Sequence, residues 1–158
     1  MNVDVMAELL HKHPFVEDLQ PHNIEMLAGL ASEVSYEKNQ IVFREGDDCG
    51  LFYLILSGKV ALEISAPGRT IRVQTLNAGD ELGWSSVLAQ ERLFQARALE
   101  PVRMLALDGV RLHEVCKEDP VFGYELMYRL LRVVSRRLQA TRFQLMDVYA
   151  PAAKPVHA

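Results

Sequence analysis

The chain has 158 residues, of which 49% are hydrophobic and 24% charged, a composition typical of one globular domain with a single packed core. Its 17 lysines and arginines and 21 aspartates and glutamates give a formal net charge of -4. This balance argues against non-specific attraction to nucleic acid, so DNA is not an expected partner.

The N-terminus, the apolar runs and the cysteines indicate the cellular compartment. The first residues show no basic segment followed by a long apolar run, so we expect no secretion signal. No apolar run approaches the ~20 residues that a membrane span requires. Cys49 and Cys116 have no further thiol or histidine at metal-ligand spacing, which favours reduced thiols in a cytoplasmic protein without a metal site.

The first 31 residues have a helical pattern. Apolar side chains recur at three- and four-residue steps over residues 3–10 and again over residues 23–30. Pro21 stands where the second helix can begin, because proline is tolerated at the first helical position. We therefore expect two short N-terminal helices.

Residues 32–107 change to short apolar segments separated by glycine-containing turns. This spacing predicts a meander of antiparallel strands with one face toward the core and one toward solvent. In the strand after Gly58, alternation predicts that Ala61 and Glu63 face outward. Asp80 and Glu81 fall at a tight turn, where we expect solvated carboxylates.

The pattern is helical again over residues 108–149. A short helix covers the segment that follows Asp108, and Asp119 then provides an N-cap with Pro120 at the first helical position. The second helix is expected to run to about Tyr149. Residues 1–149 therefore form the domain, and the alanine- and proline-rich residues 150–158 are expected to be a disordered tail.

The long helix has two apolar rows. One row follows the four- and three-residue steps of a coiled-coil seam: Met127, Leu131, Val134, Leu138, Thr141, Leu145 and Val148. The other row, Leu126, Leu130, Val133 and Ala140, can pack onto the strands. A monomer would leave one row exposed, so we predict a parallel homodimer along the seam. The alternative is a single wide core-facing stripe on a monomer.

Four segments carry a family resemblance: residues 42–47, 51–60, 76–83 and 135–141. Their order and spacing resemble the cyclic-nucleotide-binding domain of cyclic-AMP receptor proteins, protein kinase A regulatory subunits and nucleotide-gated channels. The resemblance implies a mainly β fold with helices: an antiparallel β-roll (a double-stranded β-helix, jelly-roll-like) flanked by N-terminal helices and a long C-terminal helix.

The resemblance also implies a site for a small anion. In this family a cyclic phosphate is held by backbone N–H groups at a short helix start and by one buried arginine. The matching positions, with those on the long helix, are Gly83, Trp84, Ser85, Ser86, Arg92, Leu93, Thr141 and Arg142. Arg92 either holds the anion or pairs with a neighbouring carboxylate of Glu81, Glu91 or Glu100, whereas Arg97 is interpreted as structural.

Two of these positions depart from the family. Trp84 replaces a glutamate that accepts from the ribose 2′-hydroxyl, and Leu93 replaces a small hydroxyl residue that touches phosphate. A buried charge-assisted hydrogen bond contributes roughly 1.5–3 kcal/mol, so binding of cAMP or cGMP should be weakened. Trp84 either stacks on a ligand or fills its place.

The long helix could also contribute to the site. A threonine matching Thr141 contacts the purine in the receptor proteins, and the alternative here is a threonine tolerated in the seam. Arg142 replaces a family serine. It either reaches an anionic ligand in its own or the partner subunit, or is a solvated surface residue.

These observations favour a regulator over an enzyme. The histidines are scattered, and no nucleophile, metal or nucleotide-loop motif is present in the sequence. The chain ends soon after the long helix, where the receptor proteins continue into a helix-turn-helix domain. We expect a stand-alone sensor that signals through its dimer helix to an unidentified protein partner. A ligand-free interaction module and a transcription-factor relative without its DNA reader are the alternatives.

Overall fold

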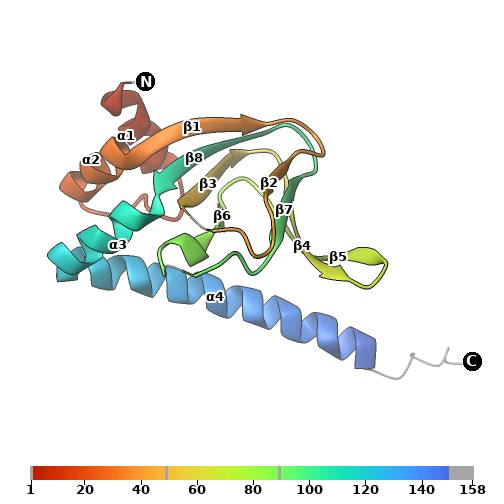
Figure 1. Cartoon of the computed structure of the whole chain (residues 1–158). Helices are drawn as coiled ribbons and strands as arrows, with labels where there is room; N and C mark the ends of the chain where they lie inside the picture. The colour runs from red at the N-terminus through yellow and green to blue at the C-terminus, as the bar shows by residue number, and fades with distance from the viewer. Residues whose placement is uncertain (1, 49, 89, 150–158) are drawn as a thin grey trace, which may run out of the picture.

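The computed structural model describes residues 2–48, 50–88 and 90–149. Within them, the elements in chain order are α1 (Val3–Lys12), α2 (Pro21–Leu30), β1 (Ala31–Tyr36), β2 (Ile41–Phe43), β3 (Leu51–Ser57), β4 (Val60–Ala66), β5 (Arg69–Leu76), β6 (Glu81–Leu82), the 3-10 helix η1 (Trp84–Ser86), β7 (Gln95–Ala98), β8 (Val102–Asp108), α3 (Gly109–Glu118) and α4 (Pro120–Tyr149). Figure 1 shows the helices at one end of the strands and along one side. The expected fold class is confirmed, whereas the predicted disordered tail lies outside the described residues.

The strands form two antiparallel four-stranded sheets, in the orders β1-β8-β3-β6 and β2-β7-β4-β5. In the described chain, β4 and β5 are the only consecutive strands that are neighbours in a sheet, so the prediction of a meander was wrong. Pro101 stands between β7 and β8, at a point where the chain passes from one sheet to the other. The reason is that pairing in a roll joins strands far apart in the chain, which turn residues do not specify.

Strand β4 also departs from simple alternation. Ala61 is fully buried and Glu63 is 8% exposed, so the expected outward faces were wrong for both residues. β4 lies between β5 and β7. Two long side chains of β7 hold Glu63: Gln95 Nε2 donates to its Oε1 at 2.9 Å and Arg97 Nε at 3.1 Å. Arg97 therefore has the structural role expected of it.

The core has two parts, and β3 separates them. Phe52 and Leu54 belong to the part that includes buried side chains of all four α-helices. Tyr53 and Ile55 belong to the part inside the roll. Because both faces of β3 are buried, this strand is an almost continuous apolar run rather than an alternating one.

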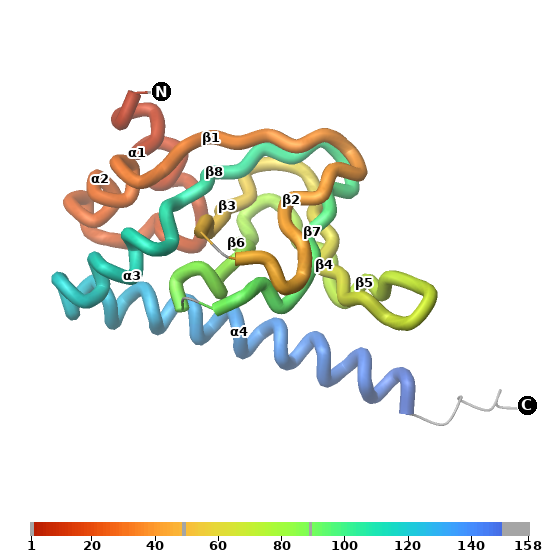
Figure 2. The backbone as a smooth tube through the Cα atoms, viewed as in Figure 1, coloured from red at the N-terminus to blue at the C-terminus, as the bar shows by residue number. Residues whose placement is uncertain are grey.

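Helix α4 runs beneath the β-roll, and its C-terminal half extends below the β4–β5 hairpin (Figure 2). It begins as predicted, because Asp119 Oδ1 accepts a hydrogen bond from Phe122 N at 3.2 Å. Of the row predicted to pack onto the strands, Leu126, Leu130 and Val133 are buried and Ala140 is half-buried. Further along, Gln144 Nε2 donates to the carbonyl oxygen of Val73 in β5. None of the described helices has both the length and the apolarity needed to cross a membrane.

Candidate ligand-binding site

The segment 83–93, here called the cassette, leaves β6 through a turn that requires glycine. Gly83 has a φ of 81°, in the left-handed region that other residues rarely adopt. The N–H of Ser86 donates to the carbonyl oxygen of Gly83 at 3.1 Å, and its hydroxyl donates to the same oxygen at 2.8 Å. The helical start expected here is formed, as the single 3-10 turn η1.

Arg92 lies under this turn and is 4% exposed. Its Nη1 donates to the carbonyl oxygen of Gly83 at 2.9 Å and to Ser85 Oγ at 3.3 Å, and its Nη2 donates to the carbonyl oxygen of Leu51 at 2.6 Å. Its guanidinium carbon lies 4.2 Å from the centre of the Phe43 ring, a cation–π contact. The guanidinium group thus has carbonyl and hydroxyl oxygens of the protein as hydrogen-bond partners.

The close approach of Arg92 is a second reason why position 83 requires glycine. A Cβ added to Gly83 would lie 2.6 Å from Arg92 Nη1 and 2.9 Å from the carbonyl oxygen of Leu51. Both distances are shorter than van der Waals contact. The glycine at position 83 is therefore needed both for the turn and for the position of Arg92.

The cavity beside Arg92 has a volume of ≈ 20 Å³. That is room for about one water molecule. Its lining residues are Phe43, Leu62, Leu82, Gly83, Trp84, Ser85, Arg92, Leu93, Phe94 and Arg137. The cassette thus brings together most of the predicted site residues, but in this conformation the cavity does not hold a nucleotide.

Trp84 both lines this cavity and packs against the core below the helices, where it is partly buried. Leu93 lies at the mouth and is 50% exposed. Ser86 is buried, and its hydroxyl is used by the turn rather than by the cavity. The indole and the leucine thus make the cavity small and mainly apolar.

Arg137 reaches the cavity from α4, and sequence reasoning did not select it. Its side chain is 13% exposed and its Nη2 lies 3.5 Å from Oε1 of Glu81, whose side chain is 5% exposed. Nη2 also donates to the carbonyl oxygen of Glu81. Burial raises the pKa of the Glu81 carboxyl and lowers that of the Arg137 guanidinium, while each partner's charge opposes the shift.

Glu81 was expected to be a solvated turn residue, and this was wrong: it is 4% exposed. It is the first residue of β6, one residue beyond the turn, and Arg137 covers it from α4. A sequence signal for Arg137 did exist. It is a charged residue four positions after Val133, on the core-facing row of α4, where an arginine needs a buried partner.

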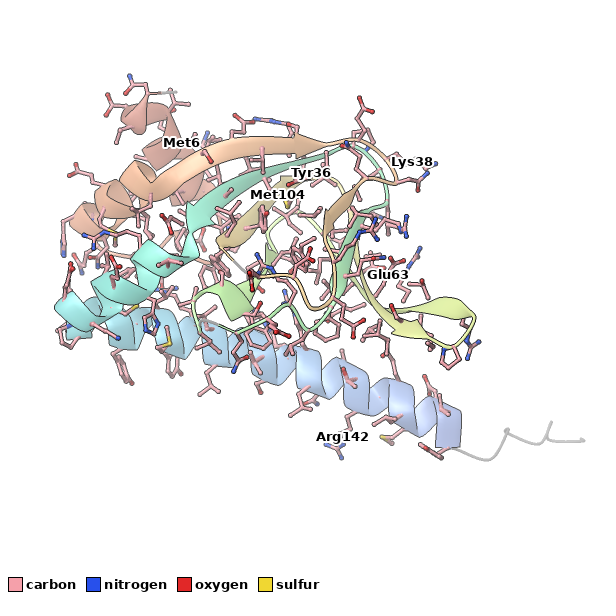
Figure 3. All side chains as sticks on the ribbon, viewed as in Figure 1. Met6, Tyr36, Lys38, Glu63, Met104 and Arg142 are labelled. Atoms are coloured by element: carbon pink, nitrogen blue, oxygen red, sulfur yellow. The ribbon has the colours of Figure 1, made fainter. Side chains whose placement is uncertain are left out.

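Thr141 and Arg142 do not line the cavity of their own chain. Thr141 Oγ1 donates to the carbonyl oxygen of Arg137 at 3.0 Å, within the helix. Arg142 is exposed and points away from the β-roll on the far side of α4 (Figure 3). Their predicted ligand contacts therefore require either a movement of α4 or a second subunit.

Comparison with known proteins places this geometry in a family. The cyclic nucleotide-binding domain model matches residues 33–119, more than half of the chain. The CRP-like cAMP-activated global transcriptional regulator of Mycobacterium tuberculosis is 29% identical over 145 residues, which cover 90% of this chain. The chain spans 63% of the length of that regulator.

Solved structures agree in fold. The catabolite activator protein of Thermus thermophilus is 25% identical with a TM-score of 0.68, over 85% of this chain and 62% of that one. A cyclic nucleotide-binding domain from Methylobacillus flagellatus, 18% identical, has a TM-score of 0.77 over 96% of this chain and 86% of its own. With the β-roll, the left-handed glycine turn and the buried arginine, these matches show that the chain belongs to the cyclic nucleotide-binding domain family.

Proposed function

We propose that this chain is a cytoplasmic regulatory sensor that binds a cyclic nucleotide or another small anionic ligand at the cassette. Its similarity to a cAMP-activated regulator makes cAMP and cGMP the first candidates. Binding would be read out through α4 by a protein partner, and no catalytic step is involved.

The observation that carries the proposal is that α4 shares the cassette cavity through Arg137. The same cavity is lined by Arg92, so the side chains of two arginines from different elements border one small space. An anion entering it would interact with both groups, because charge-assisted hydrogen bonds to arginine are strong in a buried site. Ligand binding and the position of α4 are thus linked by contact.

The small volume of the cavity makes this linkage obligatory. A ligand larger than water needs space that Trp84, Leu93 or Arg137 must vacate, and Arg92 must exchange its carbonyl partners for the ligand. A ligand that favours the opened cassette therefore shifts the population toward a different packing of α4. The closed cassette is one of two states under this proposal.

The predicted homodimer would carry the signal. Four residues of the proposed seam are more than half exposed in the single chain: Leu131 67%, Leu138 69%, Leu145 53% and Val148 74%. Met127, Val134 and Thr141 of the same row are partly buried. An exposed apolar row of this length favours a partner helix over water.

One observation favours a second candidate, a ligand-free interaction module. The cavity holds about one water molecule, and Arg92 is held by the carbonyl oxygens of Gly83 and Leu51. In that case Trp84 fills the space that a nucleotide would occupy, and the β-roll supports the surface of α4.

Trp84 fluorescence separates the two candidates, because it is the single tryptophan of the chain. We expect a saturable change on titration with cAMP, cGMP or a cyclic dinucleotide, weakened roughly tenfold or more in Arg92→Gln. Arg111→Gln is the matched control, since Arg111 is on α3, pairs with Glu114 and does not line the cassette cavity. No response to any of these ligands would favour the interaction module.

A further inference from the structure

A second cavity, larger than that of the cassette, lies on the other side of Glu81. It has a volume of ≈ 120 Å³. It is lined by Pro14, Phe15, Gly79, Asp80, Glu81, Arg129, Arg132 and Arg136, and is here called the arginine pocket. Three segments form it: the connection between α1 and α2, the turn before β6, and the middle of α4.

The three arginines form one stripe on α4. They are three and four residues apart, and because an α-helix has 3.6 residues per turn they share a face. The seam residues Leu131 and Leu138 lie on roughly the opposite side of the helix. Arg132 and Arg136 also border a groove that reaches Leu131 of the seam.

Arg129 is the fixed member of the stripe. Its side chain is 14% exposed, its Nη2 lies 2.7 Å from Asp18 Oδ1, and its Nη1 donates to the carbonyl oxygen of Phe15 at 3.0 Å. Its Nε is buried and has no hydrogen-bond partner within the described part of the chain. The structure thus holds one guanidinium in place at the floor of the pocket.

Arg132 and Arg136 are the available members. Arg132 is exposed and makes no hydrogen bond or ion pair among the described residues. Arg136 is 67% exposed along its side chain, and its closest carboxylate oxygen, Glu81 Oε1, lies 3.9 Å away. Both side chains can therefore turn toward a ligand with little loss of existing contacts.

Most of the carboxylates nearby are engaged by other arginines. Asp18 is paired with Arg129, and Glu81 with Arg137. Asp80 remains, and its Oδ2 accepts from the N–H of Asn77 at 2.7 Å. Glu125 Oε2 also lies 3.9 Å from Arg129 Nη2, so the charged groups that line the pocket beside Asp80 are chiefly the guanidinium groups of Arg132 and Arg136.

We propose that the arginine pocket binds a phosphate-type oxyanion, either inorganic phosphate or the phosphate group of a monoester. Its volume is about six times that of the cassette cavity, which leaves room for a tetrahedral oxyanion. Planar guanidinium groups bind phosphate oxygens in pairs, and Arg132 and Arg136, one helical turn apart, present that arrangement. The proposal is independent of what the cassette binds.

The test is calorimetric titration of the full chain with inorganic phosphate, with chloride keeping the ionic strength constant. We expect saturable binding that is weakened at least about tenfold in Arg132→Gln and in Arg136→Gln. Arg111→Gln is the control, because Arg111 is on α3 and does not line the pocket. Circular dichroism verifies that each variant is folded.

Two further measurements locate the phosphate site and identify the class of its ligand. Arg92→Gln should keep phosphate binding, and a loss there with retention in Arg136→Gln would overturn the proposal by assigning phosphate to the cassette. Equal binding of inorganic phosphate and glycerol 3-phosphate supports recognition of the phosphate group alone. Tighter binding of glycerol 3-phosphate supports a monoester ligand. The absence of any binding beyond that of chloride, or an equal loss in Arg111→Gln, also overturns the site.

Discussion

Arg137 and Glu81 form a buried ion pair between α4 and the first residue of β6, with 3.5 Å between Nη2 and Oε1. Glu81 also lines the arginine pocket, whereas Arg137 lines the cassette cavity. One pair of residues thus separates two basic sites and holds α4 against the β-roll. Its strength bears on both proposals.

We predict that Glu81→Ala destabilises the fold by about 3–5 kcal/mol, because it leaves the Arg137 charge buried without its partner. Chemical denaturation of the variant measures the loss. The double variant Glu81→Leu with Arg137→Met should be much closer to the native chain, since it removes both charges and keeps apolar volume. If the single and double variants lose the same stability, the cost comes from packing and not from the ion pair.

His13 predicts a pH dependence of stability. It is 3% exposed, and its Nδ1 accepts a hydrogen bond from the N–H of Phe15 at 3.2 Å. Burial lowers its pKa from the usual 6.5, so the unfolded chain binds a proton more readily than the folded one. The stability due to neutral His13 is therefore complete above pH 6.5 and is lost as the pH falls below it.

This pH dependence is tested by denaturation of the native chain and of His13→Asn between about pH 5 and about pH 8. Asparagine keeps an acceptor for Phe15 N–H and does not titrate, so the stability difference between the two proteins should change below pH 6.5. His22→Gln, at an exposed position, is the matched control for the loss of a histidine. A constant difference across the range would show that His13 does not titrate in this way.

Gly83→Ala should cost more stability than Gly68→Ala. Both glycines have a positive φ, 81° and 74°, and carry the same backbone penalty of roughly 1–2 kcal/mol for alanine. A Cβ at Gly68 meets nothing within 4 Å, whereas one at Gly83 meets Arg92 Nη1 at 2.6 Å. The excess loss in Gly83→Ala, measured by denaturant titration, reports the displacement of Arg92. Equal losses would mean that Arg92 moves aside freely.

Leu138→Lys should convert a homodimer into a monomer in sedimentation experiments. Leu138 is 69% exposed in the single chain and lies in the middle of the predicted seam. In the dimer, a lysine at this position from each subunit would place a charged side chain between the two paired helices. Gln139→Lys, exposed on the adjacent position outside the seam, is the control and should stay dimeric. A native chain that sediments as a monomer would contradict the seam.

The local features of the fold were accessible from the sequence alone. Apolar periodicity located α1, α2 and the two C-terminal helices, and the Asp119–Pro120 pair located the start of α4. Glycine turns marked the strand ends, and the order of motifs indicated the family and the cassette. These features depend on residues close together in the chain, where side-chain type constrains backbone conformation directly.

The tertiary structure alone decided which strands are neighbours and how the cassette is closed. The sheet order follows from pairings such as β1 with β8, which no turn residue encodes. Glu81 was predicted to be solvated and is buried because Arg137, 56 positions away, covers it. For Trp84 and for Arg92 the sequence left two interpretations open, since the pattern of a segment does not state which distant segments pack against it. Burial and charge pairing depend on contacts between distant segments, and those exist only once the chain has folded.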